Sequence, residues 1–181
     1  MHAQSVIKKM EELKAVVNVK QPDVIALTET WTNSDISDEY LCLNGYELMA
    51  RKDREDTDRG RGGGILIYVA KEICAWKVEV PGFFEQRALV KLRTKKGDLG
   101  IYVIYRSPNS SSNNDASLCE LVREMRESDV LIGEGFVGQG FVGELGEPMR
   151  KAVPSTKRWK TTFLLNTSTN QLTLAEMFST L

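Results

Sequence analysis

The sequence predicts an α+β fold, a sandwich in which helices cover a mainly antiparallel sheet. Segment 24–27 (VIAL) is an unbroken apolar run, which is typical of a strand buried on both faces. Segment 88–106 holds two alternating runs joined through KKGD, the pattern of a β-hairpin. Segment 5–18 has apolar residues at helical spacing and predicts an amphipathic helix packed on the sheet.

Further strands are predicted between the first strand and the hairpin. A short extended segment surrounds Tyr46 and Leu48, and segment 65–70 (ILIYVA) is an apolar strand. We expect segment 65–70 and the two hairpin strands to pair antiparallel in succession. Gly97 and Asp98 are expected to supply the turn of the hairpin.

The second half begins regularly and then becomes rich in glycine. A polar loop at 107–115 offers Asn and Asp candidates for a helix cap, segment 116–128 predicts a helix, and segment 129–133 predicts a buried strand. Segment 135–144 contains the tandem pentapeptides GFVGQ and GFVGE, which contain too much glycine for a helix. Thr173 and Glu176 have capping-box spacing, which predicts a short terminal helix.

Composition excludes several classes of protein. The chain of 181 residues is 41% hydrophobic and 27% charged, which fits one globular domain, and its net charge of −1 gives no global attraction to nucleic acid or anionic membrane. A partner of that kind therefore requires a local patch. The three cysteines lack CxxC spacing, and the sequence shows neither a membrane-spanning stretch nor a signal-peptide core. We therefore predict an intracellular protein, nuclear or cytoplasmic, with no membrane partner and no small-molecule cofactor.

A carboxylate ends the first apolar strand, in the sequence PDVIALTETW. Glu29 stands between two threonines at the carboxyl end of a strand that is expected to be buried. A charge in that place either faces solvent at the mouth of a loop or is compensated by a metal or another cation.

The loop from Arg51 to Gly64 carries five basic and four acidic residues followed by glycines. It is either a solvated loop of mixed charge or a place where arginines and the backbone NH groups of residues 62–64 approach phosphates. A calcium-binding loop is disfavoured, because the twelfth position from Asp53 is Gly64 instead of a bidentate Glu.

Two other chemistries are weakly indicated. Gly133, Gly135 and Gly138 fit GxGxxG, but the glycines continue to Gly146, so the pattern does not open a helix as a dinucleotide-binding motif requires. His2 is the only histidine, which makes a Ser-His-Asp triad improbable.

Five ordered motifs carry a resemblance to a known family: PDVIALTETW, GYELMARKDR, RGRGGGILIYVAKEI, IYVIYRSPNSS and DVLIGE. Together, over about residues 1–134, they resemble the endonuclease/exonuclease/phosphatase family, and most closely the endonuclease domain of non-LTR retrotransposons. The resemblance implies a four-layered α/β sandwich of two mainly antiparallel sheets flanked by helices, here incomplete at the C-terminus. It assigns residues 1–134 to a partial domain and leaves residues 135–181 unmatched.

The resemblance also implies roles for individual residues. Glu29 matches the family's metal-binding Glu, which holds a divalent cation, usually Mg²⁺, and Tyr105 matches the Tyr that lines the scissile phosphate. Asn109 is a neighbouring polar contact, and Glu134 matches an Asp that positions the nucleophile, with its carboxylate on a longer side chain. The nucleic-acid contacts are expected to come from four arginines: Arg51, Arg54, Arg61 and Arg106.

Three departures from the family pattern qualify the expected activity. His2 stands where an Asn is expected, Phe136 replaces an Asn whose amide contacts the phosphate, and no Ser-Asp-His motif follows. Losing one member of a catalytic unit typically costs about 10²-fold in rate. The sequence therefore predicts Mg²⁺-dependent hydrolysis of DNA phosphodiesters at a low rate or not at all. The alternative is a non-catalytic module that binds nucleic acid or a protein. The sequence does not identify a protein partner.

Overall fold

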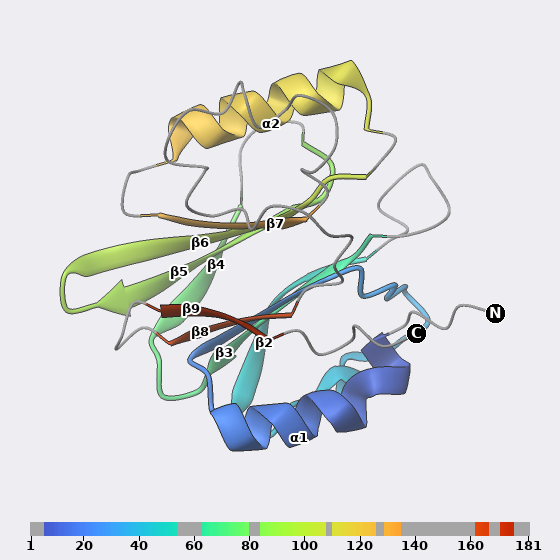
Figure 1. The fold of residues 1–181 in the computed structure, drawn as a ribbon, viewed down its shortest axis with the longest axis vertical. Coiled ribbons are helices and arrows are strands. Elements are labelled where there is room, and N and C mark those ends of the chain that lie inside the picture. The colour runs from blue at the N-terminus through green and yellow to red at the C-terminus, as the bar shows by residue number, and fades with distance from the viewer. Residues whose placement is uncertain are drawn as a thin grey trace.

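In the computed structural model the protein is described over residues 6–53, 63–79, 84–107, 110–125, 129–134, 162–166 and 171–175. Two sheets face each other, and a helix covers the outer face of each, which gives four layers (Figure 1). The predicted layered α+β sandwich is therefore confirmed. In the part of the chain that is described, no helix combines the length and the hydropathy needed to cross a bilayer.

The first sheet has five strands in the order β2-β3-β1-β8-β9, all antiparallel. Its strands are β1 (Val24–Thr28), β2 (Tyr46–Lys52), β3 (Ile65–Ala70), β8 (Thr162–Asn166) and β9 (Gln171–Ala175). The central strand β1 pairs with β3 on one side and with β8 on the other, and all five of its residues are buried. Residues from the part of the chain without a recognised motif thus supply the second neighbour of the central strand.

The second sheet has four strands in the order β4-β5-β6-β7. They are β4 (Ala75–Val78), β5 (Arg87–Thr94), β6 (Gly97–Tyr105) and β7 (Val130–Glu134). Strands β4, β5 and β6 are antiparallel neighbours, while β7 is parallel to β6. A parallel pair needs a crossover, and the chain between β6 and β7 contains the helix α2 (Ser112–Glu124).

Three apolar clusters hold the layers together. Between the sheets, Val24 and Ala26 of β1 face the cluster that includes Val103 and Ile132. The alternate residues Ile25 and Leu27 point to the other face of β1, where α1 packs. A third cluster joins α2 to the second sheet through five buried residues: Phe84, Leu89, Ile104, Leu118 and Leu121. Each such fully buried side chain contributes about 1.5–3 kcal/mol to folding.

The predicted N-terminal helix is present with modified ends. A 3-10 turn, η1 (Val6–Lys9), precedes the helix α1 (Met10–Lys20), and a second 3-10 turn, η2 (Asp38–Leu41), lies before β2. Met10, Leu13 and Val17 are the buried positions of α1, as their spacing predicts. The helix ends at Gln21, whose φ of 45° places it in the left-handed region.

Several sequence predictions were wrong in detail. β3 does not pair with the hairpin strands, because it joins the first sheet whereas β5 and β6 join the second. The hairpin turn is formed by residues 95–96, and Gly97 already pairs with Thr94. The second helix starts earlier than predicted, since the Ser111 hydroxyl accepts from the Asn114 backbone NH and caps it.

The prediction of a short terminal helix is also wrong for its first residues. Residues 171–175, which include Thr173, form strand β9 in place of a helical turn. They pair with β8, which in turn pairs with β1, so tertiary strand pairing overrides the local capping pattern. Glu176 lies outside the described residues.

Candidate functional site

Glu29 lies immediately after β1, where the backbone takes an unusual course. Its φ is 54°, and that of Trp31 is 55°, so two residues with large side chains sit in the left-handed region. Such strain costs of the order of 1–3 kcal/mol for each residue and persists only where surrounding contacts impose it. Strained residues of this kind cluster at functional sites.

Two donors hold a single oxygen of the Glu29 carboxylate. Trp31 Nε1 donates to Glu29 Oε2 at 2.5 Å, and the backbone NH of Gly63 donates to the same oxygen at 3.1 Å. Both donors are neutral, so they fix the position of the carboxylate without forming an ion pair with it. Among the described contacts, Oε1 is the oxygen that remains open to a cation.

Gly63 and Gly64 connect the first sheet to the second. The Trp31 backbone NH donates to the Gly63 carbonyl at 3.1 Å, and the Gly64 NH donates to Gln86 Oε1 at 2.8 Å. Gly64 has a φ of 91°, and a Cβ added there would lie 2.4 Å from Thr30 Oγ1. Glycine is therefore required at this position by both conformation and space.

These contacts change the predicted role of the glycines. One of the two interpretations of this loop had the backbone NH groups of residues 62–64 approach phosphates; those of Gly63 and Gly64 donate to Glu29 and Gln86 instead. Glycine at positions 63 and 64 does allow the backbone to approach its partners closely, but these partners are side chains of the protein and not phosphates. Residue 62 lies outside the described part of the chain.

Tyr105 comes from the second sheet and reaches the same end of the sandwich. A Cβ on Gly63 would lie 3.1 Å from Gln86 Oε1 and 3.7 Å from Tyr105 Cδ1, so these three residues are in contact distance of one another. The Tyr105 NH donates to the Gln86 carbonyl at 3.0 Å. Glu29 and Tyr105, far apart in the sequence, are therefore brought together through Gly63. We call Glu29, Trp31, Gly63, Gln86 and Tyr105 the rim.

Glu134 is placed next to the rim by strand register. It is the partner of Tyr105 in the parallel pair of β6 and β7. Its backbone thus ends β7 beside the tyrosine, while its side chain lies outside the described part of the structure.

The two described arginines among the predicted nucleic-acid contacts are held by carboxylates. Arg51 donates through Nε to Asp53 at 2.8 Å and through Nη1 to Asp38 at 2.6 Å, while Nη2 donates to the Asn33 carbonyl. The hydrogen bond to Asp53 is the largest cause of the raised pKa of Arg51. This arginine ties β2 to the loop that follows β1, and its contact with nucleic acid stays a prediction.

Arg106 is still more enclosed. It is 8% exposed and forms two parallel hydrogen bonds to Asp115, Nε to Oδ1 at 2.8 Å and Nη2 to Oδ2 at 2.7 Å. Those hydrogen bonds hold the pKa of Asp115 below its ordinary value. Asp115 belongs to the first turn of α2, so the pair fixes the start of that helix to the end of β6. A nucleic-acid contact by Arg106 also remains a prediction.

The other residues singled out from the sequence cannot be placed. Five of them lie outside the described residues: His2, Arg54, Arg61, Asn109 and Phe136.

Among the described side chains of the rim, Glu29 is the carboxylate that could bind a metal ion. In the described ranges, no group of three or more His, Cys, Asp or Glu side chains could hold a metal ion. Mg²⁺ is commonly bound by one or two carboxylates with water and substrate phosphate completing the shell. Glu29, anchored through Oε2 with Oε1 open, fits that mode of binding.

Sequence reasoning missed two members of the rim. Trp31 lies inside the quoted PDVIALTETW motif, yet its indole was assigned no role; the Glu-Thr-Trp spacing could have suggested a donor two residues from the carboxylate. No sequence motif marks Gln86, because its position beside Gly63 depends on how the loops of the two sheets meet.

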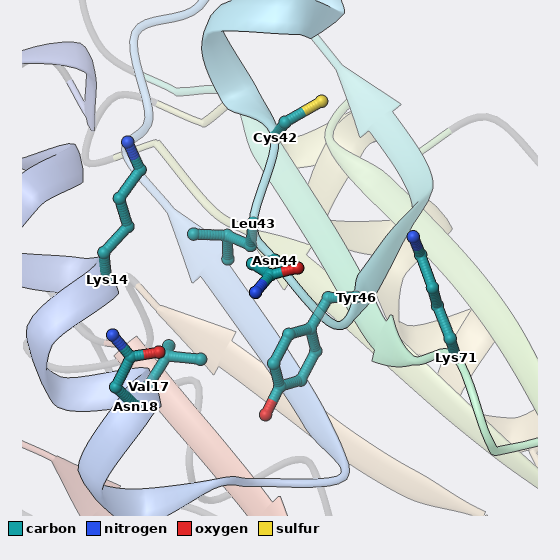
Figure 2. Close-up of a pocket in the computed structure, with 8 residues that line it drawn as sticks. All are labelled: Lys14, Val17, Asn18, Cys42, Leu43, Asn44, Tyr46 and Lys71. Atoms are coloured by element: carbon teal, nitrogen blue, oxygen red, sulfur yellow. The ribbon is translucent and has the colours of Figure 1, made fainter.

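A separate cavity of about 570 Å³ lies between α1 and the segment leading into β2. Figure 2 shows Lys14 and Asn18 on the helix facing Asn44 and Tyr46 across it. The Tyr46 hydroxyl donates to the Pro22 carbonyl, and burial raises its pKa. None of the rim residues lines this cavity, so it is not part of the candidate site.

Comparison with solved structures identifies the fold. The chain superposes on an AP endonuclease, LMAP, from Leishmania major with a TM-score of 0.56 and 19% identity, over 80% of this chain and 60% of that one. It superposes on an endonuclease/exonuclease/phosphatase family protein from Leptotrichia buccalis with a TM-score of 0.52 and 14% identity, over 80% of this chain and 68% of that one. The endonuclease domain of TRAS1, a telomere-specific non-LTR retrotransposon, gives a TM-score of 0.47 at 13% identity, over 75% and 64% of the two chains.

The chain thus has the fold of the endonuclease/exonuclease/phosphatase proteins, as the five sequence motifs predicted. It spans three fifths of the length of the Leishmania enzyme. No protein-family model and no curated protein sequence matches it.

Proposed function

We propose that the protein is a metal-dependent phosphodiester hydrolase that acts on DNA and whose reaction takes place at the rim. The observation that carries the proposal is the anchored carboxylate of Glu29, held on Oε2 by Trp31 and Gly63 beside Tyr105. The fold shared with an AP endonuclease supports the reaction class.

Each rim residue has a chemical task in this proposal. Glu29 would hold a divalent cation such as Mg²⁺, and that ion would supply stabilisation of the negative charge that develops on the phosphate. The Tyr105 hydroxyl donates to a phosphate oxygen and orients the scissile bond. Trp31 and Gly63 keep the carboxylate in one position, so that little reorganisation is needed when the substrate binds.

We propose in addition that the rate is reduced relative to a complete family site. Glu134 has a side chain one methylene longer than the Asp expected there, and Phe136 offers no amide to the phosphate. These two departures favour the second candidate function, a nucleic-acid-binding module that retains the site without its turnover.

Nicking of supercoiled plasmid tests the proposal and separates the two candidates. We expect the purified protein to nick in Mg²⁺, to stop when the metal is chelated, and to lose the activity in Glu29→Gln. Gln keeps an oxygen acceptor for Trp31 Nε1 and the Gly63 NH but removes the charge, so the loop should stay folded. Metal-independent nicking, or equal nicking by Glu29→Gln, would refute the hydrolase; absence of nicking with retained DNA binding would establish the second candidate.

A further inference from the structure

The outer face of the second sheet is covered by α2 at one end and carries basic side chains at the other. Alternate residues of β5 point to opposite faces of the sheet. Val90 and Leu92 face the cluster between the sheets, whereas Leu89 faces α2. Lys91 and Arg93 therefore continue the face of Leu89 towards the end of the hairpin, which extends beyond α2 (Figure 1).

The turn of the hairpin adds two lysines at the same end of the sheet. Lys95 and Lys96 connect β5 to β6, and both are exposed. The Thr94 hydroxyl accepts from the Lys96 NH at 3.2 Å and donates to the Gly97 carbonyl at 2.7 Å, which fixes the backbone that carries them. We call these four basic residues the tip surface: Lys91, Arg93, Lys95 and Lys96.

Two neighbours hold the guanidinium of Arg93. The register puts Trp76 of β4 opposite Lys91 on the same face, and the Arg93 guanidinium carbon lies 5.6 Å from the centre of the Trp76 ring. Arg93 Nε lies 2.9 Å from Asp98 Oδ1, while the Arg93 side chain stays 63% exposed. The indole thus supports a cation that faces solvent, and a phenylalanine at position 76 would keep a ring beneath it.

The charges on this face favour an anionic polymer as the partner of the tip surface. Two described carboxylates share the face with its four cations: Asp98 beside Arg93, and Asp129, which accepts from the Gly100 NH at 3.0 Å. The whole chain has a net charge of −1, so a nucleic acid can be attracted only by a local excess of positive charge. Lysine and arginine bind phosphate groups through charge-assisted hydrogen bonds.

The tip surface lies at the opposite end of β5 from the rim. Gln86 of the rim stands just before this strand, and Lys95 stands just after it. The eight residues of β5 span about 24 Å, because an antiparallel strand rises by about 3.4 Å per residue. About seven base pairs of DNA cover that distance. A partner bound at the tip surface therefore leaves the rim free.

We propose that the tip surface is a second DNA-binding surface, which binds phosphates of the DNA backbone away from the rim. The choice of DNA as the partner rests on the proposed function, whereas binding at this surface requires neither the metal nor turnover. Contacts to phosphates carry no base information, so the surface should increase the affinity for duplexes of any sequence.

The salt dependence of DNA binding tests these phosphate contacts. The main variant combines Lys91→Gln, Lys95→Gln and Lys96→Gln, and its affinity for a fluorescent duplex is measured without metal at several salt concentrations. We expect the affinity at low salt to fall about 10- to 100-fold, and the slope of log K against log salt to decrease by about 2 to 3. An affinity and a slope equal to those of wild type would overturn the proposal.

The matched control removes the same charge elsewhere. It combines Lys8→Gln, Lys20→Gln and Lys71→Gln, three exposed positions outside the tip surface, and should bind DNA nearly as wild type does. Losses equal to those of the main variant would show that only the net charge matters, and would overturn the proposal.

A variant that conserves charge separates binding from folding. Lys91→Arg, Lys95→Arg and Lys96→Arg together keep the three cations, so this variant should bind DNA with the affinity and the salt slope of wild type. An affinity as low as that of the main variant would show that the lysines act through the fold, and would overturn the proposal. Polyglutamate that displaces DNA at an equal concentration of charge would indicate an acidic protein as the partner, and would also overturn it.

Nuclear magnetic resonance locates the contact on the protein. The indole NH signal of Trp76 in ¹⁵N-labelled protein is identified by its loss in Trp76→Phe. Because Arg93 lies over this ring, we expect the signal to shift saturably as the duplex is added without metal. A Trp76 signal that stays unchanged while the protein binds DNA would contradict the proposal.

The two proposals fail in different ways. A wild-type protein that never nicks plasmid, but loses DNA affinity and salt slope in the main variant, would refute the hydrolase and support the tip surface. Metal-dependent nicking by wild type and by the main variant at the same KM, with equal DNA affinity, would support the hydrolase and overturn the tip surface.

Discussion

Glu29 and Asp115 are two carboxylates near the same end of the sandwich with opposite surroundings. Asp115 accepts two parallel hydrogen bonds from the Arg106 guanidinium, so both of its oxygens and its charge are compensated. Glu29 accepts from an indole and a backbone NH on one oxygen alone, so its charge has no described counterion. The same residue chemistry thus serves as structural support at Asp115 and as a site for a ligand at Glu29.

The arginines show the same difference. Arg51 and Arg106 looked from the sequence like contacts for phosphates, yet both are bound to carboxylates of the protein. Each N–H group that such an arginine already donates to a carboxylate is engaged within the protein. Arg51 and Arg106 thus have structural partners within the protein, and their contact with nucleic acid stays a prediction.

The largest effect on stability is expected from Gly64→Ala. The added Cβ would lie 2.4 Å from Thr30 Oγ1 on a backbone with φ of 91°, so both overpacking and strain oppose folding. We expect the free energy of unfolding to fall by about 3 kcal/mol, measured by urea denaturation. Gly45→Ala is the control: its φ is 82° with nothing within 4 Å, so strain alone should cost about 1 kcal/mol. Equal losses in the two variants would show that the contact with Thr30 does not matter.

Asp115→Asn is expected to destabilise the protein by about 2 kcal/mol at pH 7. It leaves the Arg106 charge, 8% exposed, without its carboxylate, which costs more than the net value of the pair. The unfolding free energy measured in urea would fall while plasmid nicking by the folded fraction stays unchanged. A selective loss of nicking would instead place Asp115 in the site.

The difference in unfolding free energy between wild type and Asp115→Asn should depend on pH, which tests whether the ion pair with Arg106 causes it. The pairing with Arg106 lowers the pKa of Asp115 in the folded state, so the unfolded chain binds the proton more readily. Stability from this group is therefore fully present above the unfolded pKa of about 3.9 and is lost as the pH falls through the folded pKa. Wild type and Asp115→Asn should converge in stability below that range. A difference that stays constant from pH 7 to pH 2 would exclude the ion pair as its cause.

Trp31→Phe should act on activity more than on stability. It removes the Nε1 donor to Glu29 Oε2 while keeping an aromatic side chain, so the carboxylate loses one of its two anchors. We expect plasmid nicking to fall about 10-fold. Trp76→Phe on β4, where Arg93 lies 5.6 Å from the centre of the ring, is the matched control and should leave the nicking rate unchanged.

The smallest effect is expected from Lys14→Met. The Lys14 ammonium lies 2.8 Å from Glu11 one turn away on α1, and both side chains are exposed. Such exposed pairs contribute at most about 0.5 kcal/mol, and salt screens them. Urea denaturation at low and high salt should therefore show a slight loss that disappears at high salt; a loss above 1 kcal/mol would require a packing role for the Lys14 stem.

Local patterns in the sequence predicted the parts of the fold that depend on local physics. The apolar run of β1, the alternation in β5 and β6 and the spacing of Met10, Leu13 and Val17 all reflect burial at neighbouring positions. The pairing partners did not follow from these patterns: β3 joins β1 instead of the hairpin, and β9 forms where a helix cap was expected. Such choices depend on contacts between distant segments.

The candidate site was also predicted only in part: two of its residues could be found from sequence motifs, and their contacts with distant segments could not. Glu29 and Tyr105 could be found because each ends a strand with a recognisable motif, and the structure brings them together at Gly63. The Arg51 and Arg106 partners, Asp38 and Asp115, could not be deduced, because each ion pair joins elements whose proximity the sequence does not specify. Gln86 stayed hidden for the same reason.

The most direct measurement is the nicking rate of Glu29→Gln and of Asp115→Asn in Mg²⁺, each divided by the folded fraction from its urea curve. We expect Glu29→Gln to lose nicking while it unfolds at the urea concentration of wild type. We expect Asp115→Asn to unfold at lower urea while its folded fraction nicks at the wild-type rate. The reverse result, with activity retained in Glu29→Gln and lost in Asp115→Asn, would contradict the assignment of the ligand site to Glu29.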